Sequence, residues 1–299
     1  MLITFRLECM LEASMGRSLA GKVIVITGGA RGIGAATASA LARLGAQVAI
    51  GDLDLDVAKA TADELGENAT ALPLDVTDRV RFTEFLDEVE RQLGPIDVLI
   101  NNAGIMPLGP FEDEADRTTG HQLEINLHAV IHGTREAVKR MRPRASGHIV
   151  NIASAAGKAG FPGGATYCAT KHAVVGLSEA VRMELRGTGV DVSVVLPAIV
   201  RTELATGLTE ARFIKSVGPE AVADAIVKTL QSPKFEVFVP RSLTGTFYLT
   251  RLLPRRAAEW VARALKADQL LLNAEHSART AYEARAEASA PAADRETGA

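Results

Sequence analysis

The chain has 299 residues, of which 47% are hydrophobic and 23% charged, and its formal net charge is −3. Such a chain offers no basic surface to neutralise phosphates, so we expect no nucleic-acid partner. Its two cysteines cannot build a disulfide framework, and no cysteine and histidine cluster has the spacing of a zinc site. These counts favour a cytoplasmic protein without a bound metal.

The segment 1–20 lacks the long apolar core of a signal peptide or a transmembrane helix, because Arg6, Glu8 and Glu12 interrupt its apolar character. We expect it to be a flexible leader that precedes the folded chain.

Short apolar runs alternate with longer amphipathic stretches from residue 21 to residue 240. The apolar runs are nearly continuous in hydrophobicity, as in strands that are covered on both faces. The predicted strands are Val23–Thr27, Gln47–Asp52, Ala69–Leu74, Asp97–Asn101, His148–Ala153, Asp191–Leu196 and Phe235–Val239. The predicted helices are Gly32–Leu44, Val57–Leu65, Asp78–Leu93, Arg117–Met141, Ala165–Arg186 and Pro219–Leu230. This alternation predicts one α/β domain of the Rossmann type, a doubly wound parallel sheet of seven strands with helices on both faces.

A glycine-rich turn connects the first predicted strand to the first predicted helix. It reads Thr27-Gly28-Gly29-Ala30-Arg31-Gly32-Ile33-Gly34. Residues without side chains let the backbone approach a pyrophosphate, and the amides at the helix N-terminus can receive the anion. At the first strand of an alternating pattern, this turn predicts a dinucleotide site.

The glycine spacing Gly-x-x-x-Gly-x-Gly, together with further motifs, resembles that of the short-chain dehydrogenase/reductase family over about residues 20 to 240. The further motifs are Asn101-Asn102-Ala103-Gly104, Asn126, Ser154 and Tyr167-Cys168-Ala169-Thr170-Lys171. The resemblance implies an NAD(P)-dependent oxidoreductase that transfers a hydride between nicotinamide and a secondary alcohol or ketone. The chain departs from the family pattern at Ala198, where relatives usually have a glycine after the proline.

Tyr167 and Lys171 are four residues apart in a predicted helix, which puts both side chains on one face. A tyrosine with a pKa near ~10 is a poor base, but an adjacent ammonium and a positive nicotinamide favour its phenolate. We therefore expect Tyr167 to be the general acid/base and Ser154 to orient the substrate oxygen. By resemblance, Lys171 also binds the nicotinamide ribose, and Asn126 holds a water that links Lys171 to solvent.

Asp52 ends the second predicted strand, about twenty residues beyond the glycine turn, where a carboxylate can accept from both adenosine ribose hydroxyls and repel a 2′-phosphate. It could alternatively only cap the next turn. Arg31 points the other way, because a basic residue in the turn could pair with a 2′-phosphate. We favour NAD as the cofactor, with NADP as the alternative.

Position and resemblance together assign a larger set of residues to cofactor binding. By resemblance, Asp75 and Val76 contact the adenine, although Asp75 could also cap the helix that Thr77 and Asp78 open. The assigned residues are Gly28, Ala30, Arg31, Gly32, Ile33, Gly34, Asp52, Leu53, Asp75, Val76, Asn102, Ala103, Gly104, Tyr167, Lys171, Pro197, Val200 and Thr202.

The substrate is expected to contact Ser154, Phe161, Tyr167 and Ile199. The residues placed at the mouth of the site are mostly apolar, which favours a lipophilic alcohol or ketone, although the same side chains could simply pack a lid. They are Met106, Leu108, Ala156, Phe161, Ile199, Leu204, Leu208 and Phe213.

Two other functions remain open beside an NAD-linked alcohol dehydrogenase or ketone reductase. One is an NADPH-dependent 3-oxoacyl-thioester reductase, which Arg31 would suit. The other is a nucleotide-sensing regulator without catalysis, against which the intact Asn126, Ser154, Tyr167 and Lys171 argue. By resemblance, the two long helices pair between subunits and give a homodimer or homotetramer.

The C-terminal extension 241–299 differs from the rest of the chain. Basic residues lie among large apolar ones up to Leu272, and a polar Ala/Glu/Arg-rich stretch follows, which predicts a helical extension with a disordered end. It could cover a sheet edge, swap onto a partner, roof the active site or rest on an anionic membrane. We favour packing within the chain or the dimer over membrane contact.

Overall fold

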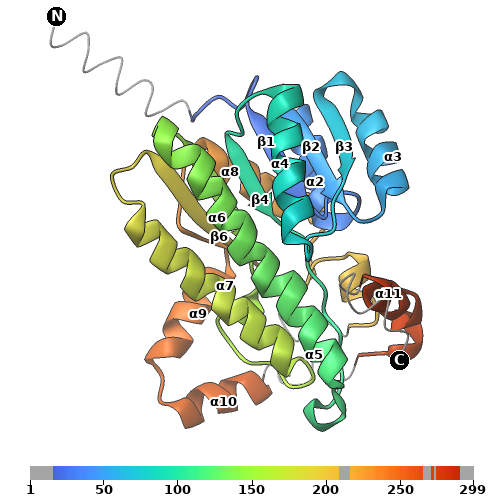
Figure 1. Ribbon diagram of the computed structural model, residues 1–299. Helices are drawn as coiled ribbons and strands as arrows, with labels where there is room; N and C mark the ends of the chain where they lie inside the picture. The colour runs from blue at the N-terminus through green and yellow to red at the C-terminus, as the bar shows by residue number, and fades with distance from the viewer. Residues whose placement is uncertain (1–15, 209–215, 265–270, 273, 290–299) are drawn as a thin grey trace, which may run out of the picture.

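The computed structural model describes residues 16–208, 216–264, 271–272 and 274–289. Seven parallel strands form one sheet in the order β3-β2-β1-β4-β5-β6-β7 (Figure 1). The predicted doubly wound α/β fold is confirmed, and each predicted strand end lies within one residue of the observed end. The strands are β1 (Val23–Thr27), β2 (Gln47–Asp52), β3 (Ala69–Pro73), β4 (Val98–Asn101), β5 (Gly147–Ile152), β6 (Val190–Pro197) and β7 (Glu236–Val239).

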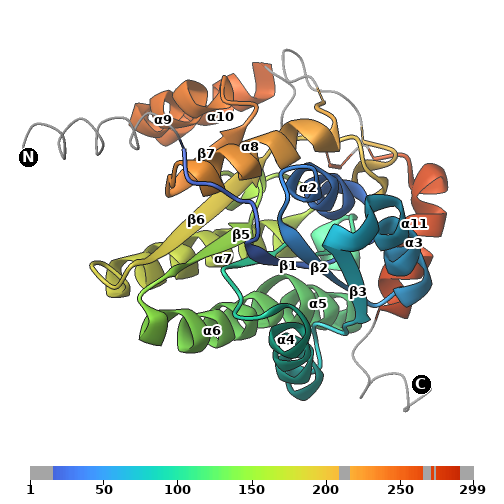
Figure 2. The ribbon, with the colours of Figure 1, turned by 90° about the horizontal axis from the view of Figure 1, so that it is seen from above.

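Helices cover both faces of the sheet, as Figure 2 shows. Alternate residues of each strand face opposite layers, so Ile24 packs with α2 and α8 while Val25 packs with α4 and α6. The first layer contains α2 (Gly32–Ala42), α3 (Leu55–Leu65) and α8 (Pro219–Gln231). The second layer contains α4 (Arg79–Leu93), α6 (Ala129–Met141) and α7 (Ala165–Glu184).

The predicted helix Arg117–Met141 is not a single α-helix. It comprises α5 (Asp116–Leu123), the π-helical segment η3 (Glu124–His128) and α6. The prediction of one regular helix was wrong because hydrophobic periodicity does not register a local widening of the helical turn. Such π-segments are frequent at functional sites, and this one contains Asn126.

The strand order reverses between β1 and β4, which lie side by side although two strands separate them in the sequence. In open α/β sheets, ligands bind outside the carboxyl ends of the strands at such a reversal. The fold therefore directs the search for a site to the ends of β1 and β4.

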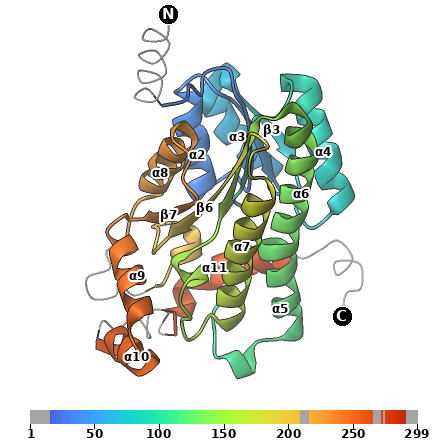
Figure 3. The ribbon, with the colours of Figure 1, turned by 90° about the vertical axis from the view of Figure 1, so that its left-hand side faces the viewer.

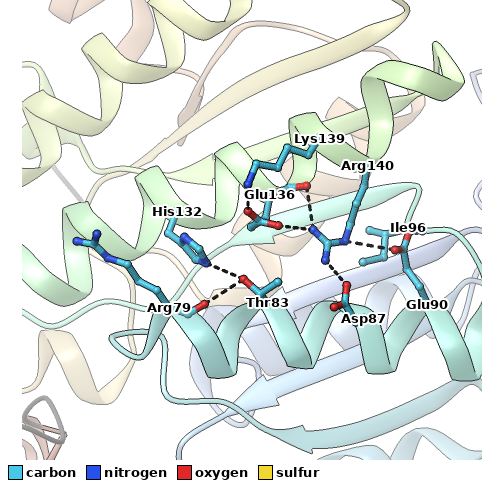
Figure 4. Close-up of polar contacts among 9 residues, drawn as sticks. All are labelled: Arg79, Thr83, Asp87, Glu90, Ile96, His132, Glu136, Lys139 and Arg140. Carbon is cyan, nitrogen blue, oxygen red and sulfur yellow. Dashed lines mark hydrogen bonds and ion pairs between the residues drawn. The ribbon is translucent and has the colours of Figure 1, made fainter.

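A polar network joins α4 to α6 on the second face of the sheet (Figure 4). Arg140 donates to Glu136 at 2.6 Å and also pairs with Asp87 and Glu90 of α4. Lys139 donates to the other oxygen of Glu136 at 2.6 Å. Burial alone would raise the pKa of Glu136, but the hydrogen bonds from Lys139 and Arg140 outweigh it and lower that pKa below 4.5.

The C-terminal extension forms α9 (Leu243–Leu252), α10 (Arg255–Ala264) and α11 (His276–Ala288). Figures 1 and 3 show α9 and α10 on one side of the molecule and α11 apart from them. The stretch that was expected to fray thus contains a helix, while residues 290–299 and most of the predicted leader lie outside the described residues. Among the helices of the described part of the chain, none is both long and apolar enough to cross a membrane.

Candidate active site

One cavity of about 390 Å³ lies at the carboxyl ends of the strands. Its walls include the glycine turn, the ends of β2 and β4, and the side chains of Ser154, Tyr167 and Lys171. All four residues expected at the substrate line it. Of the residues assigned to the cofactor, only Ala30 and Gly34 do not, because they lie behind the turn rather than on its surface.

The backbone of the glycine turn requires glycine at two positions on the cavity wall. Gly28 and Gly32 have φ of +64° and +56°, a region that other residues adopt rarely. A Cβ atom at Gly28 would lie 2.8 Å from the Cα of Ala103. No side chain caps the N-terminus of α2, and its first residues, Gly32 and Ile33, line the cavity, so uncapped amides there can hold an anion such as a pyrophosphate.

Asn102 fixes the floor of the cavity against the end of β1. Its side-chain amide donates to the carbonyl oxygens of Thr27 and Gly28 at 3.0 and 2.8 Å. The hydroxyl of Thr27 in turn accepts from the backbone amides of Asn102 and Ala103. Asn101 has a structural role, because its amide donates to Asn151 between β4 and β5 at 2.8 Å.

Asp52 has one carboxylate oxygen bonded to the glycine turn. It accepts from the amide of Ala30 at 3.0 Å, and its other oxygen accepts from the amide of Asp54 at 3.1 Å. Arg31, whose role was ambiguous in the sequence, pairs with Asp54 at 2.7 Å. The hydrogen bond from Arg31 holds the pKa of Asp54 below its usual value. Asp54 was not identified from the sequence. Its position two residues beyond Asp52 was the signal that could have placed it near the glycine turn.

Asp75 lies on the cavity wall and also organises the turn after β3. Its carboxylate accepts from the amide and the hydroxyl of Thr77 at 3.0 and 2.7 Å. The cap of α4 is Asp78, which accepts from the amides of Val80 and Arg81. The alternative interpretation, in which the Asp75 side chain caps α4, is therefore wrong, because the Asp78 side chain caps that helix.

Tyr167 and Lys171 lie one turn apart in α7 and both are buried. The Nζ of Lys171 is 5.6 Å from the centroid of the Tyr167 ring and donates to the carbonyl of Ile152 at 3.1 Å. Burial raises the pKa of Tyr167 above its ordinary value, and the nearby Ser154 side chain partly opposes that rise. Burial also lowers the pKa of Lys171 to about 8.

Asn126 is fully buried behind the cavity wall and does not line it. Its side chain donates to the carbonyl of Ile105 and accepts from the amide of the same residue, both at 2.8 Å. Gly104 separates it from Lys171, because a Cβ atom there would lie 3.1 Å from Asn126 Oδ1 and 3.5 Å from Lys171 Nζ. Asn126 also donates to the hydroxyl of Thr170 at 3.4 Å, so the π-segment ties the chain after β4 to the N-terminal half of α7.

The loop after β6 closes the cavity from the side of the glycine turn. A Cβ atom at Gly32 would lie 3.2 Å from the Cγ2 atom of Thr202. Pro197, Ile199 and Val200 also line the cavity. Phe213, expected on the lid, lies outside the described residues, and Leu108 packs behind the lining rather than in it.

The described residues of the C-terminal segment, 271–272 and 274–289, form a roof over the cavity. The sequence predicted such a roof only as one of several alternatives. Leu271 packs with Tyr167, Met106 and Cys168, and Tyr282 lines the cavity. The Tyr282 hydroxyl accepts from the amide of Met106 at 2.7 Å, and burial raises the pKa of Tyr282 to about 12.

Arg279 holds this roof in place and is itself completely buried. It donates to the carbonyl oxygens of Met106, Leu204 and Thr206 at 2.7 to 3.0 Å. It also pairs with Glu283 on the same helix at 3.2 Å. One side chain thus connects α11 to the loop after β4 and to the loop after β6.

Known proteins resemble this chain in sequence and in structure. A family model described as short chain dehydrogenase matches residues 22–212. The chain is 38% identical over 207 residues to the 3-alpha-(or 20-beta)-hydroxysteroid dehydrogenase of Mycobacterium tuberculosis, a match that covers 69% of this chain and 80% of that protein. It is 36% identical over 242 residues to the ketoacyl reductase HetN of Nostoc, covering 79% and 84%. A solved short chain dehydrogenase/reductase from Burkholderia phymatum, in complex with NAD, matches with a TM-score of 0.73 and 26% identity over 79% of this chain and 94% of its own.

Proposed function

The chain belongs to the short-chain dehydrogenase/reductase family of oxidoreductases, and from that premise we propose that it interconverts a lipophilic secondary alcohol and its ketone. We propose NAD as its preferred cofactor and Tyr167 as its general acid/base. The observation that carries the proposal is that Ser154, Tyr167 and Lys171 line one cavity whose other walls are largely apolar.

The proton chemistry follows from the surroundings of Tyr167. Its raised pKa keeps the hydroxyl protonated at neutral pH, so it can donate a proton to a carbonyl oxygen and accept one from an alcohol in the reverse direction. Ser154 donates to the same oxygen and stabilises the negative charge that develops on it. Lys171, with a pKa of about 8, is mostly charged at pH 7 and favours loss of the tyrosine proton.

A nicotinamide cofactor supplies or accepts the hydride. The residues that would hold it fit its parts: the α2 amides fit the pyrophosphate, Asp52 fits the adenosine ribose, and Thr202 fits the carboxamide. The side-chain amide of Asn126 is already hydrogen-bonded to the backbone of Ile105. We therefore propose that Asn126 positions Lys171 through Gly104, and that a water can bind only to the hydrogen-bonding positions of Asn126 that Ile105 leaves open.

The preference for NAD rests on two carboxylates. Asp52 lines the cavity and would repel a 2′-phosphate. Arg31, the residue that could attract that phosphate, is already paired with Asp54 at 2.7 Å. Binding of NADP would have to break or share this ion pair.

The proposed substrate class is supported by the apolar lining around the two hydroxyls. Met106, Phe161, Ile199, Leu204 and Leu271 all line this end of the cavity. A relative that shares 38% of the aligned sequence is named as a hydroxysteroid dehydrogenase, and steroids are lipophilic alcohols and ketones. The proposed substrates and steroid alcohols share a secondary hydroxyl on an apolar framework.

A panel of ketones and alcohols tests this proposal, with turnover followed by the absorbance of reduced nicotinamide. We expect kcat/KM for the reduction of lipophilic ketones with NADH to be larger than kcat/KM for the oxidation of small polyols with NAD. Turnover confined to polyols or charged sugars would overturn the substrate class, and tighter binding of NADPH than NADH would overturn the role of Asp52.

A second candidate function is reduction of a 3-oxoacyl thioester with NADPH, which the match to a ketoacyl reductase favours. An acetoacetyl thioester in the same panel separates the two. Activity on the thioester with NADPH alone would replace the leading proposal.

A further inference from the structure

Large apolar side chains are exposed on α9 and α10, at the side of the molecule away from α11. Leu252 is 82% exposed, Trp260 67% and Leu249 64%. Tyr248 and Leu253 of the same segment are also exposed. A concentration of exposed apolar side chains such as this marks an interaction surface rather than ordinary scatter. We call residues 241–263 the α9–α10 surface.

The α9–α10 surface is also basic, although the chain as a whole carries a net charge of −3. Its sequence contains five arginines and a single acidic residue, Glu259. Arg255 pairs with Glu259 at 3.0 Å, while Arg241, Arg256 and Arg263 are exposed. The surface therefore combines exposed apolar side chains with a local excess of positive charge.

The arrangement within α10 places charge around the exposed indole. Arg256 precedes Trp260 by one helical turn, and Arg263 follows it by one turn, so all three lie on the same side of the helix. An indole between long basic side chains suits the boundary between apolar and aqueous phases, because the ring enters the apolar region while the guanidinium groups stay at the charged surface.

The sequence alone favours packing of this segment within the chain or the dimer, but its apolar side chains are exposed. We propose that the α9–α10 surface docks on an anionic lipid bilayer, with Leu252 and Trp260 entering the interface and the arginines contacting lipid phosphates. A second copy of this chain is a poorer occupant, because a two-fold interface would bring the same arginines face to face. No helix of the described residues spans a membrane, so contact is along the surface of the bilayer.

The inner face of α9 connects this surface to the cavity. Leu243 and Phe247 line the cavity, and the ring of Phe247 stacks on Phe238 of β7 at 5.1 Å. The outer face of the same helix carries Leu249 and Leu252, which are both exposed. In the docked protein, α9 would lie between the lipid and the cavity, so an apolar substrate leaving the bilayer would meet it first. This consequence rests on the proposed function, whereas the docking proposal does not depend on it.

Co-flotation of the full chain with vesicles tests docking without any activity measurement. We expect binding to vesicles that contain phosphatidylglycerol and little binding to vesicles of phosphatidylcholine alone. Binding to the anionic vesicles should weaken as salt is added, because salt screens the arginines. Absence of binding to both vesicle types, or equal binding to both, overturns the proposal.

Variants locate the contact. The double variant Leu252→Ser and Trp260→Ser should lower partitioning by roughly tenfold or more, since two large apolar side chains no longer enter the interface. Arg256→Gln should lower it by about fivefold, the contribution of one basic residue near an anionic surface. Met183→Ser in α7, which is 66% exposed and lies outside this surface, should leave partitioning unchanged.

Two further readouts keep the result interpretable. Circular dichroism shows whether each variant is folded, and size-exclusion chromatography with light scattering gives the oligomeric state. A double variant that stays folded and dissociates into smaller particles, while vesicle binding is unchanged, identifies the surface as a contact between copies of this chain and overturns the proposal.

Discussion

The floor and the roof of the cavity are built in different ways. The floor consists of the glycine turn, the strand ends and the part of α7 that carries Tyr167 and Lys171. Side chains such as Asn102 and Asp52 bond to the turn itself. The roof, residues 271–289, is held by Arg279, which donates to main-chain carbonyls of two loops. The family model matches residues 22–212 and so includes the floor but not the roof. We infer that the floor carries the chemistry and that the roof shapes the space for the substrate.

Removing the Tyr167 hydroxyl is the strongest test of the floor. Tyr167→Phe should lower kcat by roughly 10²- to 10⁴-fold, because the general acid/base is lost while the ring still packs. Cofactor binding, measured by fluorescence titration, should change little. Tyr248→Phe, which removes an exposed hydroxyl that donates to Glu236, is the matched control and should retain full turnover. Unchanged turnover in Tyr167→Phe would falsify the assigned mechanism.

Releasing the roof should affect the substrate and not the cofactor. Arg279→Met keeps most of the length of the side chain but removes the donor from three main-chain carbonyl oxygens. The bond to Met106 is buried and the other two are part-buried, and an acceptor that stays buried without a donor costs about 1–3 kcal/mol. We expect KM for the ketone to rise by roughly tenfold or more and Kd for NADH to stay within about twofold, as in a loss of substrate contacts alone.

A neighbouring arginine controls for the loss of charge from α11. Arg285 pairs with Glu203 at 2.7 Å, with both side chains half exposed. An exposed pair contributes about 0–1 kcal/mol, so Arg285→Met should leave KM nearly unchanged. If Arg279→Met weakened NADH binding as much as substrate binding, the division between floor and roof would not hold.

The sequence predicted the floor because its side chains stand at fixed positions after predicted strands. Asn102, Ser154 and Asp52 each follow or end an apolar run, and parallel strands bring those ends to one edge. The roof could not be predicted in this way, since the partners of Arg279 are backbone carbonyls, which every residue carries. The π-segment around Asn126 was missed for a related reason, because one widened turn leaves the apolar periodicity almost unchanged.

A smaller effect is expected on the cofactor preference, which depends on two carboxylates next to the glycine turn. Asp54→Asn removes the charge that pairs with Arg31 and frees the guanidinium for a 2′-phosphate. We expect Kd for NADPH to fall by about fivefold, consistent with roughly 1 kcal/mol from one partly exposed charge pair, and Kd for NADH to stay nearly constant.

The companion change at Asp52 should act mainly on NADH binding. Asp52→Asn keeps a polar group on the cavity wall but loses the negative charge, so NADH should bind more weakly and the discrimination against NADPH should narrow. Isothermal titration with both cofactors measures each shift. Equal losses of NADH and NADPH affinity in both variants would mean that the two carboxylates support the turn without selecting the cofactor.

The network between α4 and α6 lies apart from both floor and roof, and it should therefore change stability and leave kcat alone. The pKa of Glu136 in the folded protein is lowered below 4.5, so its contribution is fully present above the unfolded-state pKa and is lost as pH falls through the folded-state value. Glu136→Gln should lower the free energy of unfolding in urea by about 1–2 kcal/mol at pH 7, the scale of charge-assisted hydrogen bonds, and the difference should shrink below pH 4.5. A difference that is equal at both pH values would show that packing, and not charge, accounts for the role of Glu136, while a fall in kcat at pH 7 would extend the catalytic region beyond the floor.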